Sequence, residues 1–292
     1  MSTPGEQGES ENTYFIDPES GAEMARLTRL DKVLTHALGG VLEALPRIAQ
    51  VRRILDVACG PGAWALEVAF TYQKVEVVGF DLSNSMMQYA NAQAKAQRLN
   101  NARFLVMDAR KQLDFSDGWF DIVNGRFLAG FMPKETWPQL VKELTRITRP
   151  GGVIRLTECD DFGVTNSPAF EQFQSFILRA MYKAGISYSP TEQTRNYGLT
   201  PMLGHFLRNA GCQNIQQQAH ILDFSAGSQA FASNYENMKL GAKLIQPFLL
   251  KWEVTTQEQL DTLYERILFE MTMPDFRGLS YIASVWGEKP PA

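Results

Sequence analysis

The sequence predicts an α/β fold: a doubly wound, mostly parallel, seven-stranded sheet with N-terminal helices and a helical cap insertion. Three observations carry this prediction. Short apolar runs alternate with helical patterns over residues 51–160, which is typical of βαβ units with right-handed crossovers. The run at 75–80 is almost continuously apolar, as in parallel strands buried on both faces. Two later strand patterns enclose a long helical stretch, which indicates a cap.

Composition limits the classes of function. The chain has 292 residues, of which 45% are hydrophobic and 21% charged, so one large domain with an insertion is expected. A net charge of −4 gives no global field that attracts nucleic acid or an anionic membrane. No apolar run is long enough to span a membrane, and no signal peptide is apparent, so we expect a cytoplasmic location. Cys59, Cys159 and Cys212 are too scattered for a disulfide framework or a C-x-x-C metal site.

The first fifty residues divide into two predicted parts. Residues 1–12 are rich in Gly, Ser, Glu and Thr, which predicts a disordered tail. Residues 13–50 are expected to form a helical lid. Apolar residues recur at three- and four-residue steps between Tyr14 and Gly40, and a second short helix is expected over 41–49.

The remaining elements follow in order. In the core over residues 51–160, strands are expected at 54–58, 75–80, 102–107, 120–124 and 153–158, with helices at 63–71, 84–97 and 135–148. Ser83 is a candidate N-cap, and Pro150-Gly151-Gly152 ends the third of these helices. Residues 161–292 are expected to form the cap and the closing strands of the same sheet. Here helices are expected at 168–184 and 201–210, strands at 214–224 and 279–286, and helical patterns broken at Pro247 over 227–277.

A glycine-rich turn follows the first predicted strand. Gly60, Gly62 and Ala65 have the G-x-G-x-x-A spacing of nucleotide-binding α/β folds. A carboxylate at Asp56 would repel a pyrophosphate at this turn and attract an ammonium group. At an effective dielectric constant near 20, two unit charges about 4 Å apart interact by ~4 kcal/mol. The sign of this interaction places an NAD-dependent oxidoreductase behind other hypotheses.

Acidic and amide side chains recur at the ends of the five core strands, namely Asp56, Asp81, Asp108, Asn124 and Glu158. Ligands of open parallel sheets bind at this edge. Asp81 lies 21 residues after Gly60, where a carboxylate accepts from ribose hydroxyls. Asp108 is placed to accept from an exocyclic amine of a base. The alternative for each Asp is an N-cap of the following helix.

Residues 50–160 resemble the class I S-adenosylmethionine-dependent methyltransferases, most closely the small-molecule branch that includes the ubiquinone and menaquinone methyltransferases. The matching segments are Ile54–Gly62, Val78–Asp81, Met107–Ala109, Phe120–Val123 and Leu144–Gly152. The resemblance implies a Rossmann-like fold with S-adenosyl-L-methionine as cofactor. The cofactor contacts that it implies are Asp56, Ala58, Gly60 and Gly62 at the methionine end, Asp81 at the ribose, Leu82, Met86, Asp108 and Ala109 at the adenine, and Asn124 near the sulfonium.

Methyl transfer requires alignment of nucleophile, methyl group and sulfur, and a base only where the nucleophile arrives protonated. The candidate catalytic residues are Glu158 at a strand end, His36 in the N-terminal helix and Arg126 after the fourth strand. His205 and His220 are weaker candidates. No Asp, His or Cys cluster has metal-ligand spacing, so no metal site is predicted. We expect Asp160-Asp161 to lie in a solvated loop or at the start of the cap.

The leading hypothesis is a metal-independent methyltransferase acting on O, C or N of a small, partly apolar or aromatic metabolite. Candidate wall residues for the acceptor are Tyr14, Phe15, Arg126, Phe127, Phe162, Phe170 and Tyr182. No nucleic-acid or membrane partner is expected, and a homodimer through Tyr14–Asp17 and the cap is a candidate assembly. A non-catalytic cofactor-binding scaffold or sensor stays open because no base is evident. An RNA or protein methyltransferase lacks a supporting basic stripe, and an NAD-dependent oxidoreductase comes last.

Overall fold

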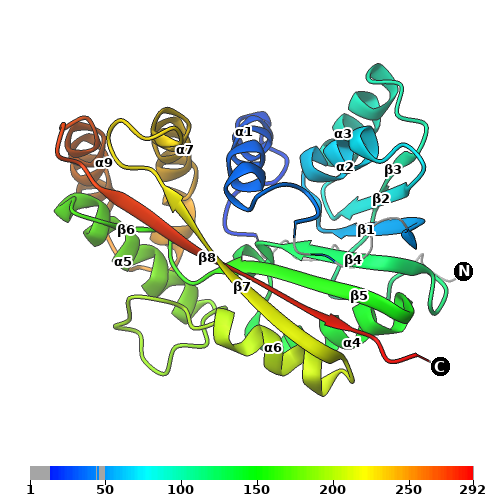
Figure 1. Cartoon of the computed structure of the whole chain (residues 1–292). Helices are drawn as coiled ribbons and strands as arrows, with labels where there is room; N and C mark the ends of the chain where they lie inside the picture. The colour runs from blue at the N-terminus through cyan, green and yellow to red at the C-terminus, as the bar shows by residue number, and fades with distance from the viewer. Residues whose placement is uncertain (1–13, 44, 46–49, 292) are drawn as a thin grey trace, which may run out of the picture.

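A mixed sheet of eight strands forms the centre of the molecule, in a computed structural model that describes residues 14–43, 45 and 50–291. The strand order is β3-β2-β1-β4-β5-β8-β6, with β7 also paired to β8 (Figure 1). The parallel strands are β1 (Arg53–Val57), β2 (Glu76–Asp81), β3 (Ala102–Val106), β4 (Phe120–Arg126) and β5 (Thr148–Cys159). The antiparallel strands are β6 (Val164–Thr165), β7 (Gln213–Asp223) and β8 (Gly278–Glu288). The predicted doubly wound, mostly parallel sheet is therefore confirmed. β6 was not predicted, because two residues are too few to show a strand pattern in the sequence.

Helices cover both faces of the sheet (Figure 1). On one face lie α1 (Gly21–Ala37), α2 (Ala63–Thr71) and α3 (Asn84–Ala96), and on the other lie α4 (Trp137–Ile147) and α6 (Thr200–Asn209). The Ser83 hydroxyl accepts from the backbone N of Met86 at 3.2 Å, so the predicted N-cap of α3 is confirmed. In the described part of the chain, no helix is both long and apolar enough to cross a membrane.

The helical excursion expected between the closing strands is present. It consists of α7 (Phe231–Leu244), α8 (Gln246–Lys251) and α9 (Gln257–Met271), and these pack with α5 (Pro168–Lys183) at the end of the sheet near β6. Pro247 lies in the first turn of α8, where proline is tolerated, and α7 ends just before it. The tail at 1–12 and most of the short helix predicted at 41–49 lie outside the described residues, and residues 41–43 form a turn.

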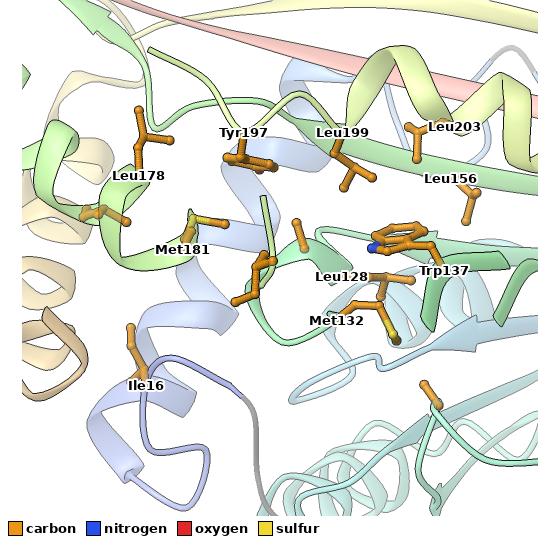
Figure 2. Close-up of a cluster of buried hydrophobic side chains, with 14 of the residues drawn as sticks. Ile16, Leu128, Met132, Trp137, Leu156, Leu178, Met181, Tyr197, Leu199 and Leu203 are labelled. Carbon is orange, nitrogen blue, oxygen red and sulfur yellow. The ribbon is translucent and has the colours of Figure 1, made fainter. Parts of the chain in front are cut away.

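Two apolar layers hold the helices on the sheet. The layer beneath α2 and α3 includes Trp64 and Met87, each about 2% exposed. Figure 2 shows part of the opposite layer, in which Trp137 of α4, Leu156 of β5 and Met181 of α5 belong to one buried cluster. Truncating such a buried Trp, Leu or Met to Ala costs about 2–5 kcal/mol. The strand ends that carry the candidate site are therefore set on a rigid support.

Candidate active site

A cavity of about 350 Å³ opens at the carboxyl ends of the parallel strands. One end lies against the loops that follow β1, β2 and β3, and the other lies against α5, α7, β7 and β8. Helix α1 closes over the cavity between these ends with a stripe at helical spacing, Leu27, Leu30, Asp31 and Leu34. One continuous space is thus shared by the core strands, the N-terminal helix and the cap.

The glycine turn after β1 presents only one of its two glycines to the cavity. Gly60 has φ +53°, and a Cβ there would lie 3.7 Å from Leu27, which lines the cavity. Gly62 has φ +78°, and a Cβ there would lie 2.7 Å from Phe104 and 2.9 Å from Ala90, in the contact between α3 and the sheet. Gly62 therefore permits close packing of the turn and does not line the cavity, although the sequence placed it among the cofactor contacts.

Asp56 ends a buried polar row at the floor of the cavity. Its side chain accepts from Asn124 Nδ2 at 2.9 Å, and Asn124 Oδ1 in turn accepts from Arg155 Nε at 2.8 Å. Arg155 also donates to the backbone O of Val41, so the row is anchored at its far end. Asn124 is fully buried and does not line the cavity. The structure therefore places Asn124 behind Asp56, where it orients the carboxyl group.

The charge of Asp56 depends on what occupies the cavity. Burial raises the pKa of Asp56 to about 7, although Arg126 nearby and the Asn124 hydrogen bond act in the opposite direction. A bound ammonium would favour the carboxylate form and lower this pKa. Asp56 is thus suited to binding a cationic group, which agrees with the ammonium contact expected from the sequence.

The next two strand ends supply the other predicted cofactor contacts. Asp81 Oδ2 accepts from the backbone N of Gly60 at 2.9 Å, and Oδ1 accepts from the backbone N of Ser83 at 3.0 Å. Each carboxylate oxygen has a second lone pair with which to accept from a ligand. Burial raises the pKa of Asp81, and these backbone hydrogen bonds oppose the shift. Leu82 and Met86 line the same end of the cavity.

Asp108 and Ala109 also line the cavity, after the end of β3. The Asp108 carboxylate is held by Arg110, which donates from Nε at 2.9 Å and from Nη2 at 3.0 Å. This pair fixes the carboxylate at the rim. Of the ten predicted cofactor residues, the structure brings eight to the cavity and leaves Gly62 and Asn124 behind its wall.

Glu158 lines the cavity from near the end of β5. It is 1% exposed, and its Oε1 accepts from the backbone N of Leu128 at 2.6 Å. Phe127 has φ +55°, a strained left-handed conformation that turns the chain after β4 and leads into Leu128. Glu158 Oε2 is buried and has no hydrogen-bond partner among the described residues. Burial raises the pKa of Glu158 to about 8, so this oxygen can hold or release a proton near neutral pH.

Two arginines fasten helix α1 over the cavity. Arg126, at the end of β4, forms an ion pair with Asp31 of α1 and donates from Nη1 to Thr35 Oγ1 at 3.1 Å. Its guanidinium also lies over the Trp64 ring, 5.5 Å from the centroid. Arg126 lines the cavity as predicted, but its partners tie it to the lid.

The second arginine joins the lid to the cap. Arg26 pairs with the fully buried Glu23 at 2.6 Å and donates from Nη1 to Asn237 Oδ1 of α7 at 2.7 Å. The Tyr14 hydroxyl donates to the same Glu23 carboxylate at 2.7 Å. Arg26, Asp31 and Asn237 line the cavity, and the sequence reasoning did not single them out because their importance depends on how α1 packs.

His36 is not brought to the cavity. It lines a separate surface depression with Thr28 and Lys32, on the other side of α1. The physical reason is the helical period, because two residues beyond Leu34 the side chain has rotated by about 200°. The side chains of His205 and Asn209 on α6 form a hydrogen bond of 2.9 Å. Neither His205 nor His220 lines the cavity. Glu158 and Arg126 are therefore the two candidate catalytic residues that line it.

The wall at the cap end is largely aromatic and aliphatic. Tyr14, Phe15, Phe127 and Phe162 line the cavity as expected, whereas Phe170 and Tyr182 do not. The sequence reasoning missed the wall residues Phe173, Ile177, Tyr197, Leu222, Phe224 and Met238. A signal existed for α7, whose lining residues follow the i, i+3, i+4, i+7, i+8 spacing of one helix face, namely Asn234, Asn237, Met238, Gly241 and Ala242. Tyr197 also belongs to the buried cluster of Figure 2.

The two aspartates that follow β5 have different roles. Asp160 accepts from the backbone N of Leu199 at 2.6 Å and from Thr200, at the start of α6. It therefore caps α6, whereas Asp161 lines the cavity. Across the described residues, no group of three His, Cys, Asp or Glu side chains is arranged to hold a metal ion.

Comparison with known sequences shows that the core of this chain is similar to methyltransferases. A family described as "Methyltransferase domain" matches residues 54–152. Methyltransferase pytC of Aspergillus terreus is 28% identical over 213 residues, which is 72% of this chain and 60% of that protein. Demethylmenaquinone methyltransferase of Geobacillus kaustophilus is 28% identical over 185 residues, which is 60% of this chain and 76% of that protein. The chain thus spans less than two thirds of pytC.

Solved structures share the fold. The YcgJ protein of Bacillus subtilis has a TM-score of 0.54 and 19% identity, covering 88% of this chain and 99% of that one. Phosphoethanolamine N-methyltransferase 2 of Haemonchus contortus, solved with S-adenosylhomocysteine, also has a TM-score of 0.54, with 17% identity, covering 93% of this chain and 57% of that one. These likenesses support a Rossmann-like fold over most of the chain.

Proposed function

We propose that this chain, which belongs to the class I S-adenosylmethionine-dependent methyltransferases, transfers a methyl group to O, C or N of a small, partly apolar or aromatic metabolite. The observation that carries the proposal is one cavity with two unlike ends. Acidic side chains at the ends of β1 and β2 occupy one end, and aromatic walls from α5 and the cap form the other. Such a space suits a polar cofactor and an apolar acceptor side by side.

The donor set fits S-adenosyl-L-methionine. We assign the methionine ammonium to Asp56, with the turn from Ala58 to Gly60 around the methionine end. The ribose hydroxyls are assigned to the free lone pairs of Asp81. Leu82 and Met86 would flank the adenine. Bound there, the cofactor supplies a methyl carbon activated by the adjacent sulfonium.

The chain's own residues contribute alignment, exclusion of water and proton transfer. Helix α1, held by Arg126 and Arg26, covers the cavity and so limits the access of bulk water to the reacting groups. We assign Glu158 Oε2 as the proton acceptor where the nucleophile arrives protonated, since Glu158 lines the cavity and this oxygen has no other partner among the described residues. We assign Arg126 a positioning role, because a guanidinium in proteins does not accept a proton. We propose a metal-independent reaction in which Glu158 is the proton acceptor.

Isothermal titration with S-adenosylhomocysteine tests the cofactor assignment. We expect binding by the wild type and by the control Glu265→Gln, an exposed carboxyl on α9. Asp81→Ala should weaken binding at least about tenfold, since two charge-assisted hydrogen bonds to the ribose are lost. Binding of NAD in place of S-adenosylhomocysteine would contradict the proposal.

Methyl transfer itself needs a second assay. Incubation of the protein and a methyl-labelled cofactor with fractions of a metabolite extract should yield a labelled product, which mass spectrometry identifies by the gain of one methyl group. Cofactor binding without any labelled product would favour a scaffold or sensor. The cytoplasmic location, the homodimer and the absence of nucleic-acid and membrane partners stay predictions from the sequence.

A further inference from the structure

The charges around the cavity are unevenly distributed. Six carboxyl side chains and three arginines line it. Each of the arginines is paired with a carboxylate, Arg26 with Glu23, Arg110 with Asp108 and Arg126 with Asp31. Within the described residues, four lining carboxyls take part in no ion pair, namely Asp56, Asp81, Glu158 and Asp161. The cavity wall therefore carries an excess of acidic groups.

These four carboxyls fall into two sets. Asp56 and Asp81 lie at the strand ends assigned to the cofactor. Glu158 and Asp161 lie beyond them at and just after the end of β5, toward the cap. Asp161 is half-buried, and its Oδ1 accepts from the backbone N of Gly163 at 2.9 Å. The cofactor's ammonium and ribose hydroxyls account for the first set, and the sulfonium, which has no hydrogen-bond donor, cannot supply a hydrogen bond to the second set.

Glu158 itself indicates a ligand group at the acceptor end. Its Oε1 is held by the backbone, while Oε2 faces no hydrogen-bond partner among the described residues although the side chain is 99% buried. A buried carboxyl oxygen without a partner is costly, and a ligand that donates a hydrogen bond removes that cost. A cationic donor removes more of it than a neutral one.

The walls beside Glu158 are suited to the same kind of group. Phe162, Phe173, Tyr197 and Phe224 line this end of the cavity. Aromatic faces attract a cation as well as packing against an apolar ring. An anionic acceptor would meet two carboxyls there and would find no unpaired lining arginine among the described residues. The charge pattern thus disfavours phosphate and carboxylate acceptors.

Resting on the proposed function, we infer that the acceptor is an amine carried by an aromatic or apolar group, and that Glu158 binds it and takes its proton. The amine enters as an ammonium and gives one proton to the Glu158 carboxylate. Its freed lone pair forms the N–C bond to the methyl carbon while the C–S bond breaks, with the electron pair staying on sulfur. The products are the N-methylated ammonium and the neutral thioether S-adenosylhomocysteine, and the proton on Glu158 leaves to solvent.

Calorimetric titration with amines and with alcohols or a carboxylate of similar size tests this inference, because it compares their affinities. The protein is first saturated with S-adenosylhomocysteine and then titrated with three matched pairs of probes: benzylamine against benzyl alcohol, benzylamine against benzoate, and tryptamine against tryptophol. We expect an amine to bind at least about tenfold more tightly than its neutral or anionic counterpart, the gain typical of a charge-assisted hydrogen bond. Glu158→Gln should remove that preference and leave the affinity for S-adenosylhomocysteine unchanged, whereas Glu265→Gln should change neither.

The outcomes separate this inference from the function beneath it. If S-adenosylhomocysteine does not bind, the proposed function fails. If it binds and the alcohols or benzoate bind as well as the amines, or no amine binds, the amine assignment fails and the methyltransferase proposal stands. Retention of the amine preference in Glu158→Gln would also overturn the role of Glu158.

Discussion

The two glycines of the turn after β1 should respond differently to the same substitution. Gly62→Ala places a Cβ 2.7 Å from Phe104 and 2.9 Å from Ala90, at a residue with φ +78°. The left-handed backbone costs about 1–2 kcal/mol for alanine. The overpacking adds about 1–3 kcal/mol, because both contacts lie in a packed core. Gly62→Ala should therefore lower the free energy of unfolding by roughly 2–5 kcal/mol.

Gly60→Ala is the matched control. It carries the same backbone cost of about 1–2 kcal/mol, but its Cβ would lie at ordinary contact distance, 3.7 Å from Leu27 and 3.9 Å from Met86. Its added methyl enters the cavity, so it should lose affinity for S-adenosylhomocysteine. Gly62→Ala should keep that affinity in the folded fraction.

Urea unfolding followed by tryptophan fluorescence, together with calorimetry of S-adenosylhomocysteine, measures both effects. Gly62→Ala should unfold at a lower urea concentration than Gly60→Ala and still bind S-adenosylhomocysteine. Gly60→Ala should be the more stable of the two variants and bind S-adenosylhomocysteine poorly. Equal loss of stability in the two variants would refute the packing argument. Loss of binding by folded Gly62→Ala, with binding intact in Gly60→Ala, would refute the assignment of the cavity-facing glycine.

Three further predictions concern titration and the lid. The folded state raises the pKa of Glu158 to about 8, above the unfolded value of about 4.3. The free energy of unfolding should therefore fall as pH rises between these two pKa values. Glu158→Gln should reduce the dependence of the free energy of unfolding on pH, by at most about 1.4 kcal/mol per pH unit. Urea titrations at several pH values measure this dependence. Burial raises the pKa of Asp56 to about 7, and the ionised form binds the ammonium. Affinity for S-adenosylhomocysteine should thus increase as pH rises to the pKa of Asp56 and level off above it. The release of the Asp56 proton should make the binding enthalpy depend on the buffer. An affinity that does not change with pH would count against the role of Asp56. Asp31→Asn removes the ion pair with Arg126 and leaves Thr35 as the hydrogen-bond partner of Arg126 on α1. Amides of α1 should therefore exchange hydrogen faster by mass spectrometry, whereas unchanged exchange would mean that other contacts hold the lid.

The core of the fold could be predicted because its signals are local. Ser83 precedes a helical pattern and has a short polar side chain, so its capping role is legible without tertiary information. The apolar run at β2 and the end of α4 before Pro150-Gly151-Gly152 likewise depend on near neighbours, although the structure includes these three residues in β5 and not in a turn. The acidic strand ends could be collected into one site because carboxyl ends of parallel strands meet at one edge.

The rest of the site depends on packing that no local pattern encodes. Asn124 has the same strand-end position as Asp56, yet their side chains meet within the wall and only Asp56 faces the cavity. His36 could have been set aside, because it lies off the leucine stripe of its own helix. The ion pair between Arg126 and Asp31 joins residues 95 positions apart, so only the docking of α1 reveals it.

The distribution of charge also explains how the fold tolerates such a site. Paired arginines neutralise the rim and the lid, while Asp56 and Glu158 are left buried with raised pKa values. Unpaired buried carboxyls destabilise the empty protein in their charged forms. The cationic cofactor should therefore bind more tightly than the neutral thioether, and at equal ligand concentration it should stabilise the fold by more. At about 100 times the dissociation constant, one bound ligand adds about 2.7 kcal/mol to the free energy of unfolding. Thermal melts with S-adenosyl-L-methionine and S-adenosylhomocysteine at matched concentrations compare the two, and a larger shift with the thioether would contradict this electrostatic account.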